Sequence, residues 1–326
     1  MAEAGCDVIV GAADDSRAQF IARARDAQVL LGSSFRGGVM GLDFLESFQS
    51  LRIISKYTIW VDDIDVDAAT ELGILVTHCP IEANWGGVAE GTLGLMLGFL
   101  KKLRERDRAV KRGGWRSPEL EGLYLGSRDD GYAGLTVGIV GLGRIGKRVA
   151  GLLAPWRARL LAYDPYVDER VFEQLNVSRV DLDTLLSEAD VVTLHCNLTE
   201  ETQRLLDAEK LALMRSTALL INTSRGAVVD LDALCDALDA ERLAGAALDV
   251  FPEEPPAAGA RILGQADKVI LSPHMVAANQ GGTLRWAIPW ATEATLAALR
   301  GQVPEHVYNT EVIPKWRTRF ADHSLL

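Results

Sequence analysis

The chain has 326 residues, of which 48% are hydrophobic and 24% are charged. This composition is typical of globular proteins and excludes a fibrous or disordered chain, and the length suits two domains of ordinary size. The net charge of -11 argues against sequence-independent binding to nucleic acid or to an anionic membrane, because both need a basic surface.

The four cysteines lack the short paired spacing of a disulfide framework or a zinc site; they are Cys6, Cys79, Cys196 and Cys235. We therefore expect no metal site and a reducing, cytoplasmic location. At the N-terminus, acidic residues appear before the basic and apolar regions of a signal peptide can form, and no apolar run reaches membrane-spanning length. We expect neither a targeting segment nor a membrane span.

The first eighty residues alternate between strand-like and helix-like segments. The strand-like runs are "DVIVG" (7–11), "AQVLLGSS" (27–34), "LRIISKY" (51–57) and "ILVTHCP" (74–80). This alternation predicts a parallel sheet covered by helices on both faces. A long helical pattern follows from about Asn84 to Arg112 and ends in basic residues, which suit the negative end of the helix dipole. Residues 113–131 then have the composition of a loop.

A second series of strands begins at Thr136. Its runs are "TVGIVG" (136–141), "RLLAYDP" (159–165), "VVTLHC" (191–196), "ALLINTS" (218–224), "AGAALDVF" (244–251) and "KVILSPH" (268–274). Six such strands are what a doubly wound dinucleotide-binding domain requires. A last helix is predicted from about Gly282 to Arg300, and we expect its Trp286 and Trp290 to lie in the core.

A glycine-rich turn follows the first strand of this second series. Gly141, Gly143 and Gly146 have the G-x-G-x-x-G spacing, in which the glycines allow a tight turn, a close approach of backbone to pyrophosphate, and close helix packing. Asp164 ends the next strand, at a distance suited to binding the ribose hydroxyls of a dinucleotide. A carboxylate there disfavours a 2'-phosphate, so we expect NAD rather than NADP, although Arg170 lies nearby in the sequence.

Three later strands are followed by residues suited to acid–base chemistry, namely Arg225, Glu254 and His274. The carboxyl ends of parallel strands border one crevice, so these side chains are able to converge. Each has an ordinary alternative: a surface ion pair for Arg225, an exposed turn carboxylate for Glu254, and a buried histidine for His274. His195 also ends a strand, and we expect it to line the nucleotide pocket rather than to perform chemistry.

Together these motifs resemble the D-isomer-specific 2-hydroxyacid dehydrogenase family, with its phosphoglycerate dehydrogenase and glyoxylate/hydroxypyruvate reductase branches. The motifs that carry the resemblance are "GLTVGIVGLGRIG", "TLHCNLTEETQRLLD", "LINTSRGAVVDLDAL", "GAALDVFPEEP" and "LSPHMV". The resemblance implies an α/β protein with two doubly wound parallel-sheet domains. A Rossmann NAD-binding domain (106–285) would be inserted into a flavodoxin-like substrate domain (1–105 plus 286–326), with the active site in the cleft between them.

The resemblance also implies roles for individual residues. Arg225, Glu254 and His274 would be catalytic, Arg144 and Ile145 would meet the pyrophosphate, and Thr223 and Asp249 would lie toward the nicotinamide. These residue types suit hydride transfer to a 2-oxo acid. Arg225 would bind the substrate oxygens, His274 would donate a proton to the developing alkoxide, and Glu254 would orient the imidazole and favour its charged form.

The substrate side departs from the family pattern. Many members read "GVGVDNID" where this chain has "TIWVDDID", and an asparagine common at the position of His78 is absent. Backbone amides of this loop usually bind the substrate carboxylate in the family, so Ile59, Trp60 and His78 are expected on the substrate side beside Arg225. We expect Trp60 to narrow the pocket or to stack on an unsaturated substrate. Arg36 is a further candidate cation, with a solvated loop arginine as its alternative.

The family commonly forms homodimers, with the loop that corresponds to 115–131 reaching over the partner. Trp115, Leu123, Tyr124 and Leu125 would be its apolar anchors, with packing inside the chain as the alternative. We expect no C-terminal regulatory domain of the kind found in some members. Proteins of similar architecture also act as corepressors, so a non-catalytic scaffold that senses NAD(H) is the alternative function.

Overall fold

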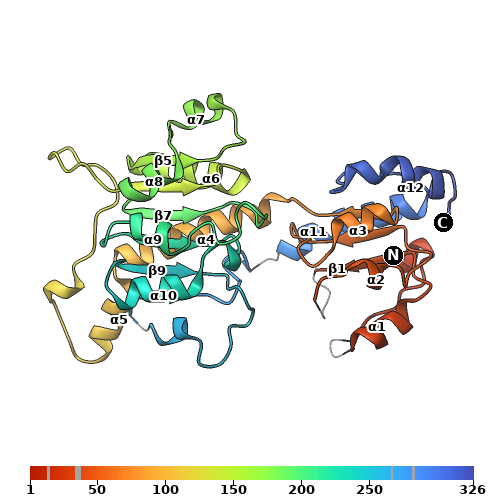
Figure 1. Cartoon of the computed structure of the whole chain (residues 1–326), viewed down its shortest axis with the longest axis horizontal. Coiled ribbons are helices and arrows are strands. Elements are labelled where there is room, and N and C mark those ends of the chain that lie inside the picture. The colour runs from red at the N-terminus through yellow and green to blue at the C-terminus, as the bar shows by residue number, and fades with distance from the viewer. Residues whose placement is uncertain (13–14, 34–37, 266, 281–282) are drawn as a thin grey trace. The chain divides into compact units, whose positions relative to one another are not determined.

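The structure is a computed structural model, and it describes residues 1–12, 15–33, 38–265, 267–280 and 283–326. These residues form two compact units (Figure 1). The smaller unit combines Met1–Asn84 with Asn279–Leu326, and the larger unit is Trp85–Ala278. The larger unit is therefore inserted into the sequence of the smaller one. The domain boundaries expected after residues 105 and 285 lie further along the chain than these divisions.

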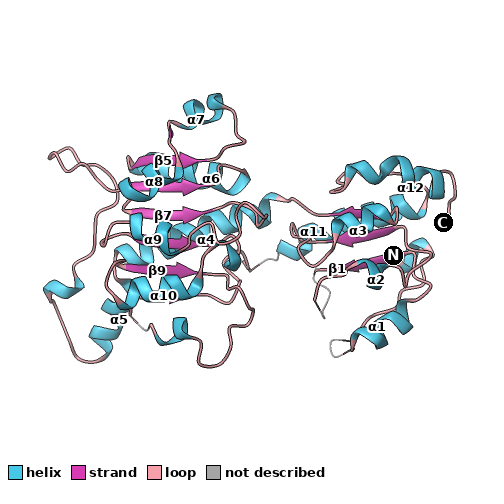
Figure 2. Cartoon of the chain, viewed as in Figure 1, coloured by secondary structure: helices cyan, strands magenta, loops and turns pink. Residues whose placement is uncertain are grey.

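The larger unit contains a parallel sheet of seven strands in the order β10-β9-β8-β7-β4-β5-β6 (Figure 2). The chain runs outward from β4 to β5 and β6 and then returns to the other side of β4 to form β7. The strands are β4 (Thr136–Val140), β5 (Arg159–Tyr163), β6 (Ser178–Arg179), β7 (Val191–Leu194), β8 (Leu219–Asn222), β9 (Gly245–Leu248) and β10 (Val269–Leu271). All six predicted strands are confirmed, and β6 was not foreseen because two exposed residues carry no pattern.

Helices cover this sheet on both faces. They are α4 (Glu82–Leu100), α5 (Leu103–Lys111), α6 (Arg144–Leu153), α7 (Glu169–Leu175), α8 (Leu182–Glu188), α9 (Ala208–Leu213) and α10 (Leu231–Asp239). Helices α8, α9 and α10 are consecutive neighbours on one face (Figure 1). Each begins at an aspartate whose carboxylate accepts a hydrogen bond from a backbone N–H of the first turn: Asp181, Asp207 and Asp230. Their leucines pack in one apolar cluster, and α4 and α6 contribute to a second one.

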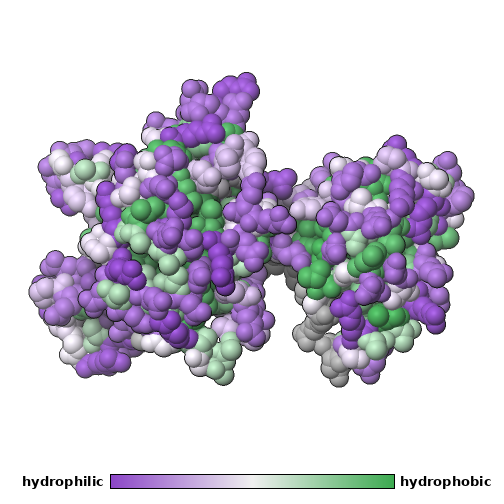
Figure 3. Space-filling model, in the orientation of Figure 1, coloured by the Kyte–Doolittle hydropathy of each residue, from purple (hydrophilic) through white to green (hydrophobic). Residues whose placement is uncertain are grey.

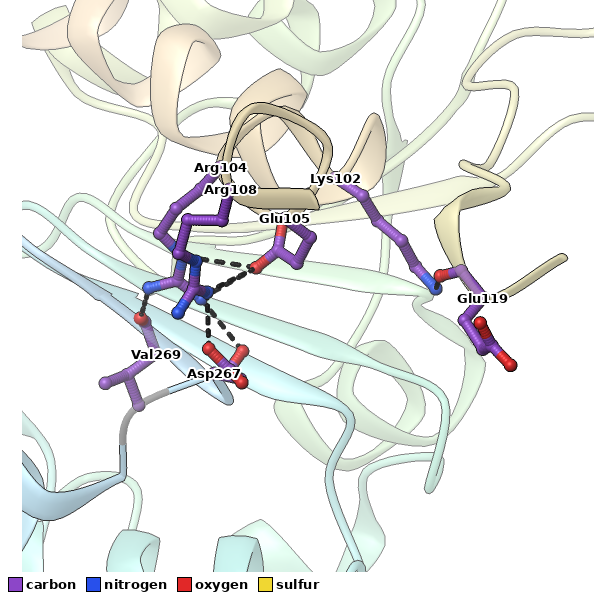
Figure 4. A network of polar contacts seen from close by, with 7 residues as sticks. All are labelled: Lys102, Arg104, Glu105, Arg108, Glu119, Asp267 and Val269. Atoms are coloured by element: carbon purple, nitrogen blue, oxygen red, sulfur yellow. Dashed lines mark hydrogen bonds and ion pairs between the residues drawn. The ribbon is translucent and has the colours of Figure 1, made fainter. Parts of the chain in front are cut away.

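The long helix predicted for 84–112 is broken near its middle. Lys102 has φ 50, in the left-handed region, and it separates α4 from α5. No glycine or proline marks this position, so the break could not be predicted from the residues around it. Figure 4 shows how α5 is then held: Arg104 donates to the backbone carbonyl of Val269 at the start of β10, and Arg108 pairs with Asp267.

The smaller unit contains a parallel sheet in the order β1-β2-β3, formed by Val29–Gly32, Ile53–Lys56 and Leu75–Thr77. Three of the four predicted strands are thus confirmed. The fourth prediction is wrong: residues 7–11 form no strand, and Val8, Ile9 and Val10 are all more than half exposed. Their β-branched side chains favour extended backbone, but no neighbouring strand among the described residues pairs with them.

The helices of the smaller unit come from both ends of the chain. They are α1 (Arg17–Ala24), α2 (Leu42–Leu45), α3 (Val66–Glu71), α11 (Thr283–Leu299) and α12 (Ile313–Phe320). The expectation that Trp286 and Trp290 are core residues is wrong, because they are 64% and 40% exposed. Helix α11 instead buries Ala287, which follows Trp286, and Ala291, which follows Trp290. The two tryptophans therefore face outward.

Hydrophilic residues dominate the visible face of each unit, with smaller apolar patches between them (Figure 3). Among the described residues, no helix has the length and apolar character needed to span a bilayer. Within the same residues, no three His, Cys, Asp or Glu side chains are grouped closely enough to hold a metal ion. All four cysteines are unpaired.

Candidate active site

The glycine-rich turn joins β4 to α6 at the point where the sheet order reverses. Gly141 has φ 91, and a Cβ there would lie 2.7 Å from the backbone nitrogen of Cys196 at the end of β7. A Cβ on Gly146 would lie 2.1 Å from the carbonyl oxygen of Gly141, so α6 can approach the turn only with glycine there. A Cβ on Gly143 would meet nothing within 4 Å. The turn therefore leaves open space at the N-terminus of α6, which suits an anionic phosphate group.

Two further predicted cofactor residues lie at this helix terminus. Arg144 is the first residue of α6 and is exposed, so its cation is accessible to a phosphate. Ile145 is half-buried and packs against the apolar cluster beneath α6. The backbone of both residues belongs to the first turn of the helix, where N–H groups have no partner within the helix. Gly143 offers no side chain to cap them.

Asp164 follows β5 and holds the other side of the glycine turn. Its Oδ2 accepts a hydrogen bond of 2.8 Å from the Leu142 N–H, and its Oδ1 accepts one of 2.9 Å from the Tyr166 N–H. The carboxylate is therefore fixed beside the turn, and its binding of ribose hydroxyls stays a prediction. Arg170 was the nearby cation that kept NADP as an alternative cofactor. It is paired with Asp168, with 2.9 Å between Nε and Oδ1.

His195 directly follows β7, and its backbone lies against Gly141 of the glycine turn. It is buried, its Nε2 lies 3.0 Å from the Thr193 hydroxyl, and its Nδ1 has no hydrogen-bond partner among the described residues. Burial lowers the pKa of His195 to about 3, so the imidazole is neutral at physiological pH. Burial also raises the pKa of the Cys196 thiol to about 11, which leaves it protonated and unreactive. The backbone of both residues packs against Gly141 of the glycine turn.

The three residues predicted to be catalytic follow three adjacent strands. Arg225 comes after β8, Glu254 after β9 and His274 after β10, and these strands are consecutive neighbours in the sheet. His274 Nδ1 lies 2.7 Å from Glu254 Oε2, and the two side chains are 39% and 37% exposed. The pair is therefore formed, and it is open to solvent. Glu254 and His274 are 20 positions apart in the sequence, and they meet because β9 and β10 are neighbours in the sheet.

Glu254 and His274 are each fixed by a backbone hydrogen bond. The Oε1 atom of Glu254 accepts a bond of 3.0 Å from the Phe251 N–H, which leaves Oε2 for the imidazole. The His274 N–H donates to the carbonyl of Asp249 over 2.8 Å, and His274 has φ 54. With Nδ1 bound to the carboxylate, Nε2 is the ring atom that can exchange a proton with a substrate.

Arg225 lies in a turn that packs tightly on the Glu254 loop. Its guanidinium donates to the Ser224 carbonyl over 2.7 Å, and its own carbonyl accepts from the Asn222 side chain. A Cβ on the next residue, Gly226, would lie 1.9 Å from the backbone carbon of Phe251. This close contact fixes the spacing between the turn that carries Arg225 and the loop that anchors Glu254.

The two residues expected near the nicotinamide make contacts within the protein. Thr223 is buried, and its hydroxyl lies 3.0 Å from that of Thr92 in α4. Thr92 donates its own proton to the Val88 carbonyl, so Thr223 must donate to Thr92 and keeps its lone pairs as acceptors. The Asp249 carboxylate is buried and accepts backbone hydrogen bonds from Met275 and Val276, the two residues after His274. Sequence motifs alone did not predict either contact.

Of the residues predicted to bind substrate, Arg225 lies in the larger unit, whereas Ile59, Trp60 and His78 lie in the smaller one. His78 Nδ1 is 3.1 Å from the carbonyl oxygen of Ile59, and the His78 ring meets the edge of Tyr308. Trp60 is half-buried, and its carbonyl accepts a weak bond from the Thr58 hydroxyl. The structure therefore brings Ile59 and His78 into contact, and Trp60 is the residue that follows Ile59 in the chain. Arg36 lies outside the described residues.

Comparisons with known proteins agree on one family. The family model of the D-isomer specific 2-hydroxyacid dehydrogenase NAD-binding domain matches residues 93–276. A glyoxylate reductase of Thermofilum pendens is 37% identical over 94% of this chain and 90% of its own length. The chain belongs to the D-isomer-specific 2-hydroxyacid dehydrogenase family.

Other known proteins are similar to this chain in sequence or in structure. A D-3-phosphoglycerate dehydrogenase of Methanocaldococcus jannaschii is 35% identical over 92% of this chain but only 55% of its own length. The crystal structure of TT0316 from Thermus thermophilus superposes with a TM-score of 0.82, at 33% identity and with 94% of both chains covered. D-lactate dehydrogenase from Aquifex aeolicus, complexed with NAD and lactic acid, has a TM-score of 0.76 at 28% identity, covering 90% of this chain and 87% of its own.

As a D-2-hydroxyacid dehydrogenase, the chain is an NAD-dependent oxidoreductase that acts on the CH–OH group of donors. The expected α/β fold with parallel sheets is also confirmed. The glycine turn, the fixed Asp164 and the open helix terminus fit the dinucleotide that this family uses. When bound, NADH supplies the hydride for reduction of a carbonyl group.

Proposed function

We propose that this dehydrogenase reduces a small 2-oxo acid with NADH to the D-2-hydroxy acid, and catalyses the reverse reaction with NAD. The observation that carries the proposal is the 2.7 Å hydrogen bond between His274 and Glu254 at the ends of adjacent strands of the nucleotide-binding sheet. Such a pair is a proton donor and its orienting group, which is what reduction of a carbonyl to an alcohol requires.

Each of the three residues has a distinct task in this proposal. Arg225 binds the carboxylate and carbonyl oxygens of the substrate through its guanidinium, which can form two parallel hydrogen bonds. His274 gives its Nε2 proton to the alkoxide as that charge develops, and takes it back in the oxidation. Glu254 accepts from Nδ1, keeps the ring oriented, and stabilises its charged form.

The substrate side of the proposal rests on the loop that contains Ile59 and Trp60. Its backbone amides would bind the substrate carboxylate, while His78 fixes the loop through the Ile59 carbonyl. Trp60 stands where the family string has glycine, so its ring would restrict the size of the substrate. The relatives named glyoxylate reductase act on a 2-oxo acid with no side chain, which is compatible with a narrowed pocket.

We also propose a cytoplasmic homodimer. The loop after α5 supports a dimer, since three basic side chains fix it by donating to its carbonyls: Lys101 to Leu123, Lys102 to Glu119, and Arg106 to Leu120. Figure 4 shows the contact between Lys102 and Glu119. Trp115, Leu123 and Tyr124 are 72%, 50% and 49% exposed and suit an interface. Leu125 is only 2% exposed and packs in the core, so it is not an interface anchor.

The deciding experiment is an NADH-consumption screen of purified protein over glyoxylate, hydroxypyruvate, pyruvate, and branched, aromatic and dicarboxylic 2-oxo acids. NADPH is run beside NADH, and Asp164 predicts that NADH is preferred.

His274→Ala should lower kcat by about 10²- to 10⁴-fold while NADH still binds. Saturable NADH binding without turnover of any acid would instead support the non-catalytic scaffold.

A further inference from the structure

One charged group in the smaller unit has no part in the function proposed above. Lys56 is the last residue of β2, and its side chain is only 1% exposed. Its Nζ lies 2.6 and 2.7 Å from the two carboxylate oxygens of Asp63. A lysine this deeply buried is rare unless it is paired with an acid. The ion pair joins the end of a core strand to the loop that follows it.

The two partners enclose the loop on which the substrate contacts depend. Lys56 precedes the segment 57–62 and Asp63 follows it, so the ion pair closes this segment at its base. Inside the closed segment, the Thr58 carbonyl accepts from the Cys79 N–H, and the Ile59 carbonyl is bound by His78. At its far end, the Asp63 carbonyl accepts from the Met40 N–H.

The charge at position 63 is also where this chain departs from its family. The family string "GVGVDNID" has asparagine where "TIWVDDID" has Asp63. Burial lowers the pKa of Lys56, and the Asp63 carboxylate opposes that shift. An amide would bind the ammonium group without neutralising it. The acid therefore makes a charged, fully buried lysine compatible with this position.

We propose that Lys56 and Asp63 are positioning residues that hold the 57–62 loop in the shape that binds the substrate carboxylate. The inference rests on the proposed function of this loop, and neither residue takes part in the chemistry. Breaking the pair should change the binding of the 2-oxo acid, because a charge left alone at the loop base would draw in water and loosen the loop. Nicotinamide binding and hydride transfer depend on the larger unit and should change little.

The test compares Lys56→Met with the conservative Lys56→Arg and with Asp63→Asn. For Lys56→Met, we expect KM for the best 2-oxo acid to rise at least tenfold, with kcat within threefold and the Kd of NADH within twofold. Hydrogen exchange of residues 57–65 should accelerate, while exchange in β4 and β8 is unchanged. Lys56→Arg keeps the charge and should restore most of the KM. Lys315→Met is the matched control, since Lys315 donates to the Glu71 carbonyl at the other end of α3.

Unchanged KM and unchanged exchange in a folded Lys56→Met protein would overturn the proposal. If that variant does not fold, Asp63→Asn decides the question, because it keeps the shape of the side chain and removes only its charge. A normal KM and normal loop exchange in Asp63→Asn would then refute the positioning role. If the wild-type protein reduces no 2-oxo acid, the proposed function fails, whereas the exchange measurement still reports whether the pair holds the loop.

Discussion

At the scale of single residues, the candidate site depends on one carboxylate that makes two bonds. Glu254 accepts from the Phe251 N–H with one oxygen and from His274 with the other. The side chain is therefore oriented by the backbone before it orients the imidazole. A residue fixed in this way can act on its partner without a search over rotamers.

Glu254→Gln tests this arrangement. Glutamine keeps the size of the side chain and can still bind the ring, but it no longer stabilises a charged imidazole. We expect kcat for 2-oxo acid reduction to fall about tenfold to a hundredfold, with the Kd of NADH unchanged. Steady-state kinetics and NADH fluorescence titration measure the two quantities. Full activity in the variant would show that the carboxylate does not assist the proton transfer.

Trp60 gives a second prediction at this scale. Replacing it with glycine restores the residue found in the family string and removes the ring from the loop. Trp60→Gly should alter the order in which 2-oxo acids are preferred, with larger acids gaining most in kcat/KM, while NADH affinity stays constant. The same panel of acids is assayed with wild type and variant. An identical ranking in both would mean that the ring faces away from the substrate.

At the scale of elements, helix α4 packs against the turn that carries His274. Thr92 of this helix binds Thr223, and the preceding Gly91 faces the residue two positions after His274. A Cβ on Gly91 would lie 2.0 Å from Val276 Cγ2 and 2.7 Å from its carbonyl oxygen. The helix and the turn can be this close only because residue 91 has no side chain.

Gly91→Ala should therefore displace the turn that carries His274. We expect kcat to fall about tenfold, since small displacements of a catalytic group are costly, with a smaller change in the Kd of NADH. Gly94→Ala is the control, because a Cβ on Gly94 meets nothing within 4 Å in the same helix. Equal kcat values for the two alanine variants would contradict a supporting role for this contact.

The elements also show which structural features a sequence reveals. Strands β4, β5 and β7–β10 were predictable because each is an apolar run that ends in turn or polar residues. The break at Lys102 was not, since lysine has no special preference for φ 50. Residues 7–11 have the composition of a strand, yet a strand exists only where another strand pairs with it. Similarly, Lys56 and Asp63 meet only because the intervening loop folds back.

At the scale of the whole molecule, His195 makes stability depend on pH. Its pKa is about 3 in the folded chain and about 6.5 when unfolded. Between these values the unfolded chain binds a proton that the folded chain does not, so stability falls as pH falls below about 6.5. The slope from this group is about 1.4 kcal/mol per pH unit.

The prediction is checked by urea unfolding of wild type and His195→Gln at pH 7.0 and 5.0. We expect wild type to lose about 2 kcal/mol more than the variant over this range, because glutamine does not titrate. The comparison with the variant removes the contribution of carboxylates, which both proteins share. Parallel pH profiles for the two proteins would show that His195 is protonated in the folded state.

The proposed dimer is also a property of the whole molecule. Trp115→Ser combined with Tyr124→Ser should convert a dimer into monomers at micromolar concentration, because both rings are exposed on the loop after α5. Sedimentation velocity gives the mass directly. Trp286→Ser is the control, as Trp286 is 64% exposed but lies in the smaller unit. A dimer that survives the double substitution would place the interface elsewhere.

The insertion of one unit into the sequence of the other has a consequence for folding during synthesis, because the two parts of the smaller unit are made at different times. Trp316 is fully buried against Ile53 and Leu75, and its indole N–H donates to the Arg52 carbonyl. We therefore expect the first three strands to stay incompletely packed until residues 279–326 have been synthesised, whereas residues 85–278 can fold as a unit before then. During that interval the early strands are exposed, and a stalled or shortened chain would leave them open to aggregation.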